Sequence, residues 1–233
     1  MIDMDIQLNL ELAIHKLVTE FIDDPYRYFT EADAVSRFHE ILETDPVFNQ
    51  QIQTKDGYKI PLVHQEYPTF FRFDDAKPVA RLGPESKSKR GHYDVVVLNP
   101  EFLVTHEAEI VKNRNIASVR DENINPLKAI VEFKLDDRGW SNGKANGAIA
   151  EMGKLILSRQ EAMLRYFVVL MRYTATTRNR WDKYWGQIIQ AATERLEIGS
   201  IFATHWISIK HNPQVHSFGN WLSKYEEKHS LSL

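Results

Sequence analysis

Two short stretches of the chain combine strand-forming apolar residues with charged side chains at positions where a buried strand rarely carries them. Residues 92–98 are rich in Val and contain Asp94, and residues 128–135 contain Glu132 and Lys134. Such β-branched stretches bounded by turn residues indicate strands. Because an isolated buried carboxylate is energetically costly, we expect these acids to be paired or to bind a cation.

The spacing of the charged residues in the second stretch places them on one face of a strand. Glu132 and Lys134 are two residues apart and point the same way, whereas Phe133 points the other way. Mg²⁺ prefers carboxylate and carbonyl oxygens. Asp94 and Glu132 can therefore share one ion, with the Phe133 carbonyl as a further ligand. Lys134 can orient or deprotonate a water and counter a phosphate charge.

This pattern makes a geometric prediction about the two acids. We expect the carboxylates of Asp94 and Glu132 to lie about 4–6 Å apart, because Mg²⁺ takes its ligands at roughly 2.1 Å. We also expect both carboxylates to face a cleft that is open to solvent.

The arrangement resembles the PD-(D/E)XK nuclease superfamily, which carries an acid on one strand and E-x-K on the next. The likeness covers about residues 30–172, and Tyr93 stands where the family often has Pro. It implies an α/β, restriction-endonuclease-like fold, in which helices flank a mixed central β-sheet and further helices precede it. It also implies phosphodiester hydrolysis that depends on Mg²⁺ or Mn²⁺, with Asp94, Glu132 and Lys134 in the active site.

The same family often adds a glutamate from a helix that precedes the sheet. A capped helix over residues 31–43 offers Glu31 and Glu40. Glu31 lies four residues before Val35 on the apolar stripe, so we prefer it as the additional catalytic acid. An acid in the first turn also simply favours the helix dipole, which is an equally good reading. Glu66, near the end of the first core strand, is a weaker candidate.

Basic residues supply candidate contacts to a nucleic acid, and we expect DNA to be the substrate. One group, Lys87, Lys89 and Arg90, directly precedes the first acidic strand, and a second contains Arg178 and Arg180 beside aromatic residues. Lys and Arg neutralise phosphates, and aromatic rings stack on bases. A solvated loop and an amphipathic helix would explain the same residues.

Hydrophobic periodicity and turn residues divide the rest of the chain into alternating helices and strands, with antiparallel pairing expected in the first half. We expect one domain over residues 1–233, with an N-terminal helix and a C-terminal helix and strand added to the core. Lys154, on the helix after Lys134, could reach a phosphate, but we expect it on a solvated helix face. The expected helices span 6–23, 31–43, 104–113, 148–160 and 178–197, the strands 58–67, 69–73, 92–98, 128–135, 164–172 and 201–209, and a loop 74–90.

Composition excludes several classes of function. The chain has no cysteine, so thiolate metal sites, disulfides and cysteine nucleophiles are absent. It shows no apolar run of membrane-spanning length, and we expect a cytoplasmic protein with no membrane partner. The net charge of −3 argues against a passive nucleic-acid coat. A homodimer is compatible with the sequence. The alternative function is a domain of the same fold that binds nucleic acid or protein without cutting.

Overall fold

The computed structural model describes most of the first two thirds of the chain and two strands near its C-terminus. The described residues are 2–24, 26–74, 77–81, 89–113, 124–136, 147–148, 151, 154–155, 158, 161–171, 203–208 and 214–216.

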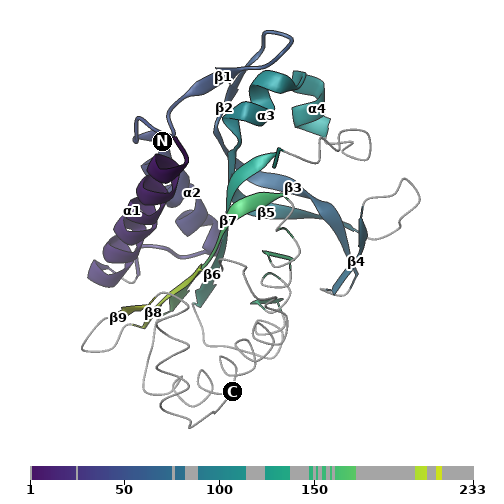
Figure 1. The fold of residues 1–233 in the computed structure, drawn as a ribbon. Helices are drawn as coiled ribbons and strands as arrows, with labels where there is room; N and C mark the ends of the chain where they lie inside the picture. The colour runs from purple at the N-terminus through teal and green to yellow at the C-terminus, as the bar shows by residue number, and fades with distance from the viewer. Residues whose placement is uncertain are drawn as a thin grey trace, which may run out of the picture.

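A mixed β-sheet forms the centre of the described part of the chain (Figure 1). Its strand order is β4-β3-β5-β6-β7-β8-β9. The pairs β4–β3, β3–β5, β5–β6 and β8–β9 are antiparallel, whereas β6–β7 and β7–β8 are parallel. The strands are β3 (Val63–Asp74), β4 (Lys77–Arg81), β5 (Lys89–Leu98), β6 (Leu127–Asp136), β7 (Ala162–Met171), β8 (Ala203–Ser208) and β9 (Gln214–His216).

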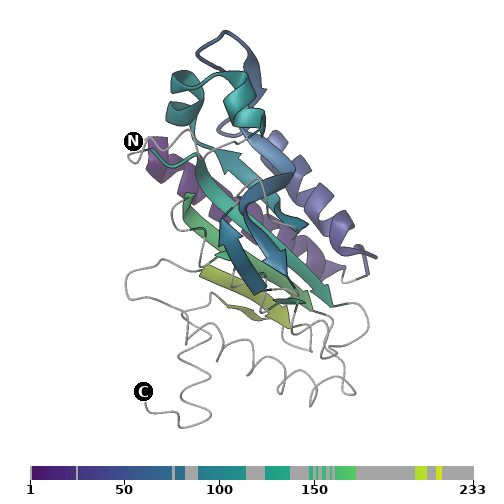
Figure 2. The same ribbon diagram turned by 90° about the vertical axis from the view of Figure 1, so that its right-hand side faces the viewer.

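Two N-terminal helices cover one face of this sheet (Figure 2). Helix α1 (Ile2–Asp23) packs against α2 and β7, and α2 (Glu31–Glu43) packs against β3, β5 and β6. The contact between α2 and β6 includes the rings of Phe38 and Phe133, whose centroids lie 5.2 Å apart. The odd-numbered side chains of β6 around Phe133 therefore face α2, and the even-numbered ones face the opposite side of the sheet.

The start of α2 is fixed by a capping box, which is encoded locally. The Thr30 hydroxyl accepts a hydrogen bond from the Asp33 N–H at 3.2 Å, and the Asp33 carboxylate accepts one from the Thr30 N–H at 2.8 Å. These bonds satisfy N–H groups that a helix start leaves open. Glu31 is consequently the first helical residue.

The connection between the parallel strands β6 and β7 crosses the face opposite α2. Its described residues, which we call the crossover segment, are residues 147–148, 151, 154–155, 158 and 161. Residues 147–148, 151 and 154–155 are helical, in agreement with the expected helix over 148–160. With helices on one side and this segment on the other, the central strands are buried on both faces.

Several expected elements match the structure, and others need correction. Helix α2 and strands β5, β6, β7 and β8 lie where the sequence predicts them, and α1 begins earlier than expected. The expected loop 74–90 is wrong in part, because β4 and the start of β5 form an antiparallel extension there. The expected helix 178–197 lies outside the described residues.

The expected strand over 58–67 and the expected helix over 104–113 each correspond to two elements. The expected strand over 58–67 is two elements, since β2 (Lys59–Pro61) pairs with β1 (Gln51–Gln53) in a separate small sheet before β3 begins. The expected helix over 104–113 is α3 (Pro100–Thr105) followed by α4 (Ala108–Asn113). Asn99 caps α3 and Pro100 opens it, a combination that favours an earlier helix start.

No helix among the described residues has the length and apolar character needed to cross a membrane.

Candidate active site

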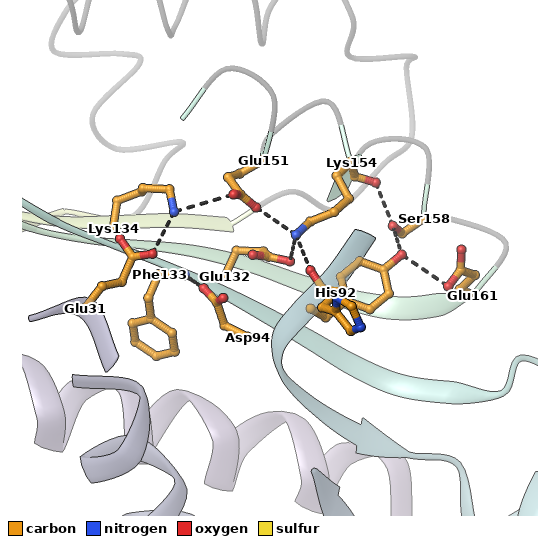
Figure 3. A network of polar contacts seen from close by, with 11 residues as sticks. Glu31, His92, Asp94, Glu132, Phe133, Lys134, Glu151, Lys154, Ser158 and Glu161 are labelled. Atoms are coloured by element: carbon orange, nitrogen blue, oxygen red, sulfur yellow. Dashed lines mark hydrogen bonds and ion pairs between the residues drawn. The ribbon is translucent and has the colours of Figure 1, made fainter. Parts of the chain in front are cut away.

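The site lies where β5 and β6 stop pairing. The register between these strands runs from Leu98↔Leu127 to Val95↔Val131. At the next position, the carboxylate of Asp94 accepts a hydrogen bond from the backbone N–H of Phe133 at 2.7 Å (Figure 3). The Asp94 side chain thus accepts a hydrogen bond that a backbone carbonyl of β5 would accept in a regular β-ladder. The pairing of β5 with β6 ends at this point.

A second carboxylate binds the same edge of β6 two residues further on. The Glu31 carboxylate accepts a hydrogen bond from the Leu135 N–H at 3.3 Å and one from the Lys134 ammonium at 2.8 Å. Alternate N–H groups of a strand point to the same edge. Helix α2 and strand β5 therefore deliver Glu31 and Asp94 to one open edge of β6. The structure places Glu31, and not Glu40, beside Lys134.

Glu132 is the most deeply buried acid of the site, with an exposed fraction of 0%. Neither of its carboxylate oxygens accepts a hydrogen bond of ordinary geometry from the described residues. The Lys154 ammonium lies 2.5 Å from Oε1 as an ion pair. Burial raises the pKa of Glu132 well above its usual range, and Lys154 opposes this shift.

Asp94 is also strongly affected by its surroundings. Burial raises the pKa of Asp94 to about 6, while Lys134 and the Phe133 N–H act in the opposite direction. Asp94 also contributes to the raised pKa of Glu132, so the two carboxylates interact electrostatically. Both acids therefore hold protons more readily than exposed carboxylates do.

Lys134 remains a cation in this environment. Burial alone would lower its pKa, but Glu151, Glu31 and Asp94 together raise it above its usual range. The Lys134 ammonium lies 2.8 Å from Glu31 and 3.5 Å from Glu151.

The crossover segment contributes two charged residues that complete the network. Burial would raise the pKa of Glu151, but Lys154 and Lys134 lower it to about 2. The Lys154 ammonium lies 2.7 Å from the Glu151 carboxylate and donates a hydrogen bond to the His92 carbonyl at 2.6 Å. Acids and lysines alternate across the site in Figure 3.

A buried polar cluster holds the crossover segment against β5. The hydroxyl oxygens of Tyr93 and Ser158 are in close contact, and the Tyr93 hydroxyl donates its proton to Glu161 at 3.1 Å. The Ser158 hydroxyl donates to the Lys154 carbonyl at 2.6 Å. Tyr93, which precedes Asp94, therefore anchors the backbone that carries Lys154.

The structure brings together the core of the expected site and leaves other candidates outside it. Asp94, Glu132, Phe133, Lys134 and Glu31 converge, as described above. Glu40 instead pairs with Arg37 at 3.0 Å. Glu66 is exposed.

The expected nucleic-acid contacts are not described at the level of side chains. Lys87, Arg178 and Arg180 lie outside the described residues, and only the backbone of Lys89 and Arg90 is described, at the start of β5.

Two expectations about the site are wrong. Glu132 does not open to a solvent-filled cleft, because Lys154 and Glu151 cover it. Lys154 does not lie on a solvated helix face, since its exposed fraction is 6%. Ala148, Glu151, Leu155 and Ser158 recur at intervals of three and four, but two of the four are polar, so hydrophobic periodicity does not mark this helix face as buried.

The oxygen atoms that meet where β5 and β6 separate are suitable ligands for a divalent cation. Among the described residues, no three His, Asp or Glu side chains are grouped as a ready metal site. Mg²⁺ needs fewer, because it usually binds one or two carboxylates and keeps several waters. Asp94 and Glu132 supply two carboxylates, and the buried Glu132 Oε2 atom has no hydrogen-bond partner among the residues that the structure describes. The Phe133 carbonyl points to the same strand edge as its N–H, toward Asp94.

Comparison with known proteins identifies no relative: no family model, curated protein or solved structure matches the chain.

Proposed function

We propose that this protein is a Mg²⁺- or Mn²⁺-dependent nuclease of the PD-(D/E)XK type that hydrolyses phosphodiester bonds in DNA. The observation that carries the proposal is the convergence of Asp94, Glu132 and Lys134 where β5 and β6 separate, with Glu31 bound to the same edge of β6. These residues belong to three elements, α2, β5 and β6, yet they meet where β5 and β6 separate.

The charges of the site support a divalent cation. Four carboxylates, those of Glu31, Asp94, Glu132 and Glu151, meet the two ammonium groups of Lys134 and Lys154. With every group ionised, the formal sum is −4 + 2 = −2. The raised pKa values of Asp94 and Glu132 reflect burial combined with this crowding of like charge. A divalent cation would restore neutrality without protonating either acid.

Asp94 and Glu132, with the Phe133 carbonyl, would hold the ion. Bound there, Mg²⁺ would polarise a phosphoryl oxygen and lower the pKa of a coordinated water. Asp94 is already oriented by the Phe133 N–H, so one of its oxygens is committed to the strand and the other remains for a ligand. The Phe133 ring packs on α2 and fixes this stretch of β6 from the other face.

Lys134 would orient the attacking water and counter the charge that develops on the phosphate. The raised pKa of Lys134 keeps it protonated at neutral pH, which argues against a role as the base that deprotonates the water. Glu31 and Glu151 hold its ammonium group between them, so both act as positioning residues.

Incubation with supercoiled plasmid, linear duplex and single-stranded DNA tests the proposal. We expect cleavage with Mg²⁺ or Mn²⁺, no cleavage with excess chelator, and no cleavage by Asp94→Asn. The absence of metal-dependent cleavage of every DNA and RNA substrate would reject the nuclease.

The second candidate is a domain of this fold that binds nucleic acid or protein without cutting. The ion pair between Lys154 and the fully buried Glu132 favours it, because such a pair also neutralises the acid without a metal. Binding of DNA with unchanged affinity in chelator, and without cleavage, would support this candidate.

A further inference from the structure

Lys154 occupies a position whose surroundings are those of a bound cation. Its ammonium group has three donors. Three oxygens surround it: Glu132 Oε1 at 2.5 Å, Glu151 Oε2 at 2.7 Å and the His92 carbonyl at 2.6 Å. The ring centroid of Tyr93 lies 5.3 Å from the same nitrogen. Two carboxylates and a carbonyl are the ligands that Mg²⁺ itself prefers.

Glu132 stands between this ammonium group and the proposed metal position. Its Oε1 atom contacts Lys154, and its buried Oε2 atom accepts no hydrogen bond of ordinary geometry from the described residues, although the neighbouring Glu151 carboxyl also helps to raise the pKa of Glu132. In Figure 3, Asp94, the other proposed ligand, and the Lys154 ammonium lie on different sides of the Glu132 carboxylate. Sites that use two metal ions hold them about 3.5–4 Å apart, a distance that one carboxylate can bridge.

We propose that Lys154 is a resident cation that takes the place of a second metal ion, so that the site binds a single divalent ion between Asp94 and Glu132. This inference rests on the proposed metal-dependent function. Lys154 touches no substrate in this arrangement. It is a positioning residue that neutralises one side of Glu132 and leaves the other side for the ion.

The packing around Lys154 opposes its displacement by an incoming ion. The exposed fraction of Lys154 is 6%, and its anchor on β5 is a backbone carbonyl, which cannot rotate away. The contacts of Tyr93 with Ser158 and Glu161 hold the backbone of the crossover segment in place. Removal of the ammonium would leave the buried Glu151 Oε2 atom without its cation.

The number of bound ions tests the inference directly. Mn²⁺ is titrated into the full chain without substrate. Calorimetry and the electron paramagnetic resonance signal of free Mn²⁺ then give the number of bound ions. We expect one ion for the parent and two for Lys154→Ala, because the vacated oxygens can then hold a second ion. Lys154→Met removes the charge but fills the space, so it should bind one ion. Lys59→Ala changes an exposed lysine in β2 and should also bind one.

The outcomes separate the inference from the proposed function. Two ions in the parent would overturn the role of Lys154 and leave the nuclease intact. One ion in a folded Lys154→Ala variant would also overturn it. No ion in the parent would overturn both proposals together. If Lys154→Ala does not fold, as judged by circular dichroism, the counts for the parent and Lys154→Met decide, and two ions in either would reject the inference.

Discussion

The Asp94 carboxylate takes the backbone N–H of Phe133 at the last position where β5 and β6 could still pair. The same contact ends the ladder and orients a proposed metal ligand. Since this N–H lies next to Glu132 in the chain, the bond also fixes where the two acids stand relative to each other.

Asp94→Asn should stabilise the protein in chelator at pH 7. The pKa of Asp94 is raised to about 6 by burial, whereas an unfolded chain has a value of about 4. The ionised form is therefore disfavoured in the folded state, and this cost is absent below about pH 4 and complete above about pH 6. Asparagine removes this cost, and its side-chain oxygen can still accept the hydrogen bond from the Phe133 N–H. We expect a gain on the order of 2 kcal/mol by urea unfolding.

The same variant should lose its response to Mn²⁺. Parent protein gains stability from the ion by mass action, whereas Asp94→Asn lacks one charged ligand. Melting temperatures with and without Mn²⁺ measure this. An equal rise in both proteins would place the ion elsewhere.

Affinity for Mn²⁺ should fall as the pH drops through about 6. Metal ligands must be deprotonated, and the pKa of Asp94 is raised to about 6, chiefly by burial. One competing proton weakens binding about tenfold between pH 7 and pH 5, and the raised pKa of Glu132 adds to the loss. Calorimetric titrations at several pH values provide the measurement. A constant affinity across this range would argue against both acids as ligands.

Lys134→Ala should reduce cleavage by about 10²–10³-fold while DNA affinity changes little. Lys134 is assigned to the developing charge of the reaction, whereas affinity is spread over many phosphate contacts. Single-turnover cleavage and fluorescence anisotropy separate the two effects, with Lys59→Ala as a control. Undiminished cleavage would remove Lys134 from the mechanism.

Glu31→Gln and Glu40→Gln form a matched pair on α2. Glu31 holds the Lys134 ammonium and the Leu135 N–H, whereas Glu40 pairs with Arg37. We expect a loss of cleavage rate on the order of tenfold or more for Glu31→Gln, because the lysine is no longer fixed. Glu40→Gln should cleave as the parent does. Equal rates in the two variants would show that Glu31 is only a helix-terminal acid.

Glu66 lies across from Asp94 on β3, between the pairs Gln65↔Val95 and Tyr67↔Tyr93, and has a φ of 49°. Residues other than glycine pay roughly 1–2 kcal/mol in this left-handed region. Glu66→Gly should therefore leave stability equal or higher, whereas Gln65→Gly, in the same strand, should lower it by roughly 0.5–1 kcal/mol. Urea unfolding compares the two. Equal losses would mean that Glu66 is unstrained.

The sequence was most informative where structure depends on neighbours along the chain. The Thr30 cap and the apolar stripe after Glu31 predict α2 with its observed bounds, and the Val-rich run predicts β5. Glu132 and Lys134 share a face because alternation is a local property of a strand. These local rules assembled most of the candidate site.

The environment of Lys154 could not be read in the same way. Its partners Glu132 and His92 are remote in sequence, and nothing local distinguishes a lysine that covers a buried acid from one in water. The loop expected over 74–90 failed for a related reason: β4 is a strand because it pairs with β3. Tertiary pairing decides such segments, and composition alone favours a loop.

The order in which the charged residues occur along the chain has a consequence during synthesis. A ribosome releases Glu31, Asp94 and Glu132 well before Lys154. Until the crossover segment emerges, Glu132 lacks the Lys154 ammonium group that pairs with it in the folded protein. The site can therefore reach its observed form only after Lys154 has left the ribosome, when β5 and β6 have been made and β7 has not.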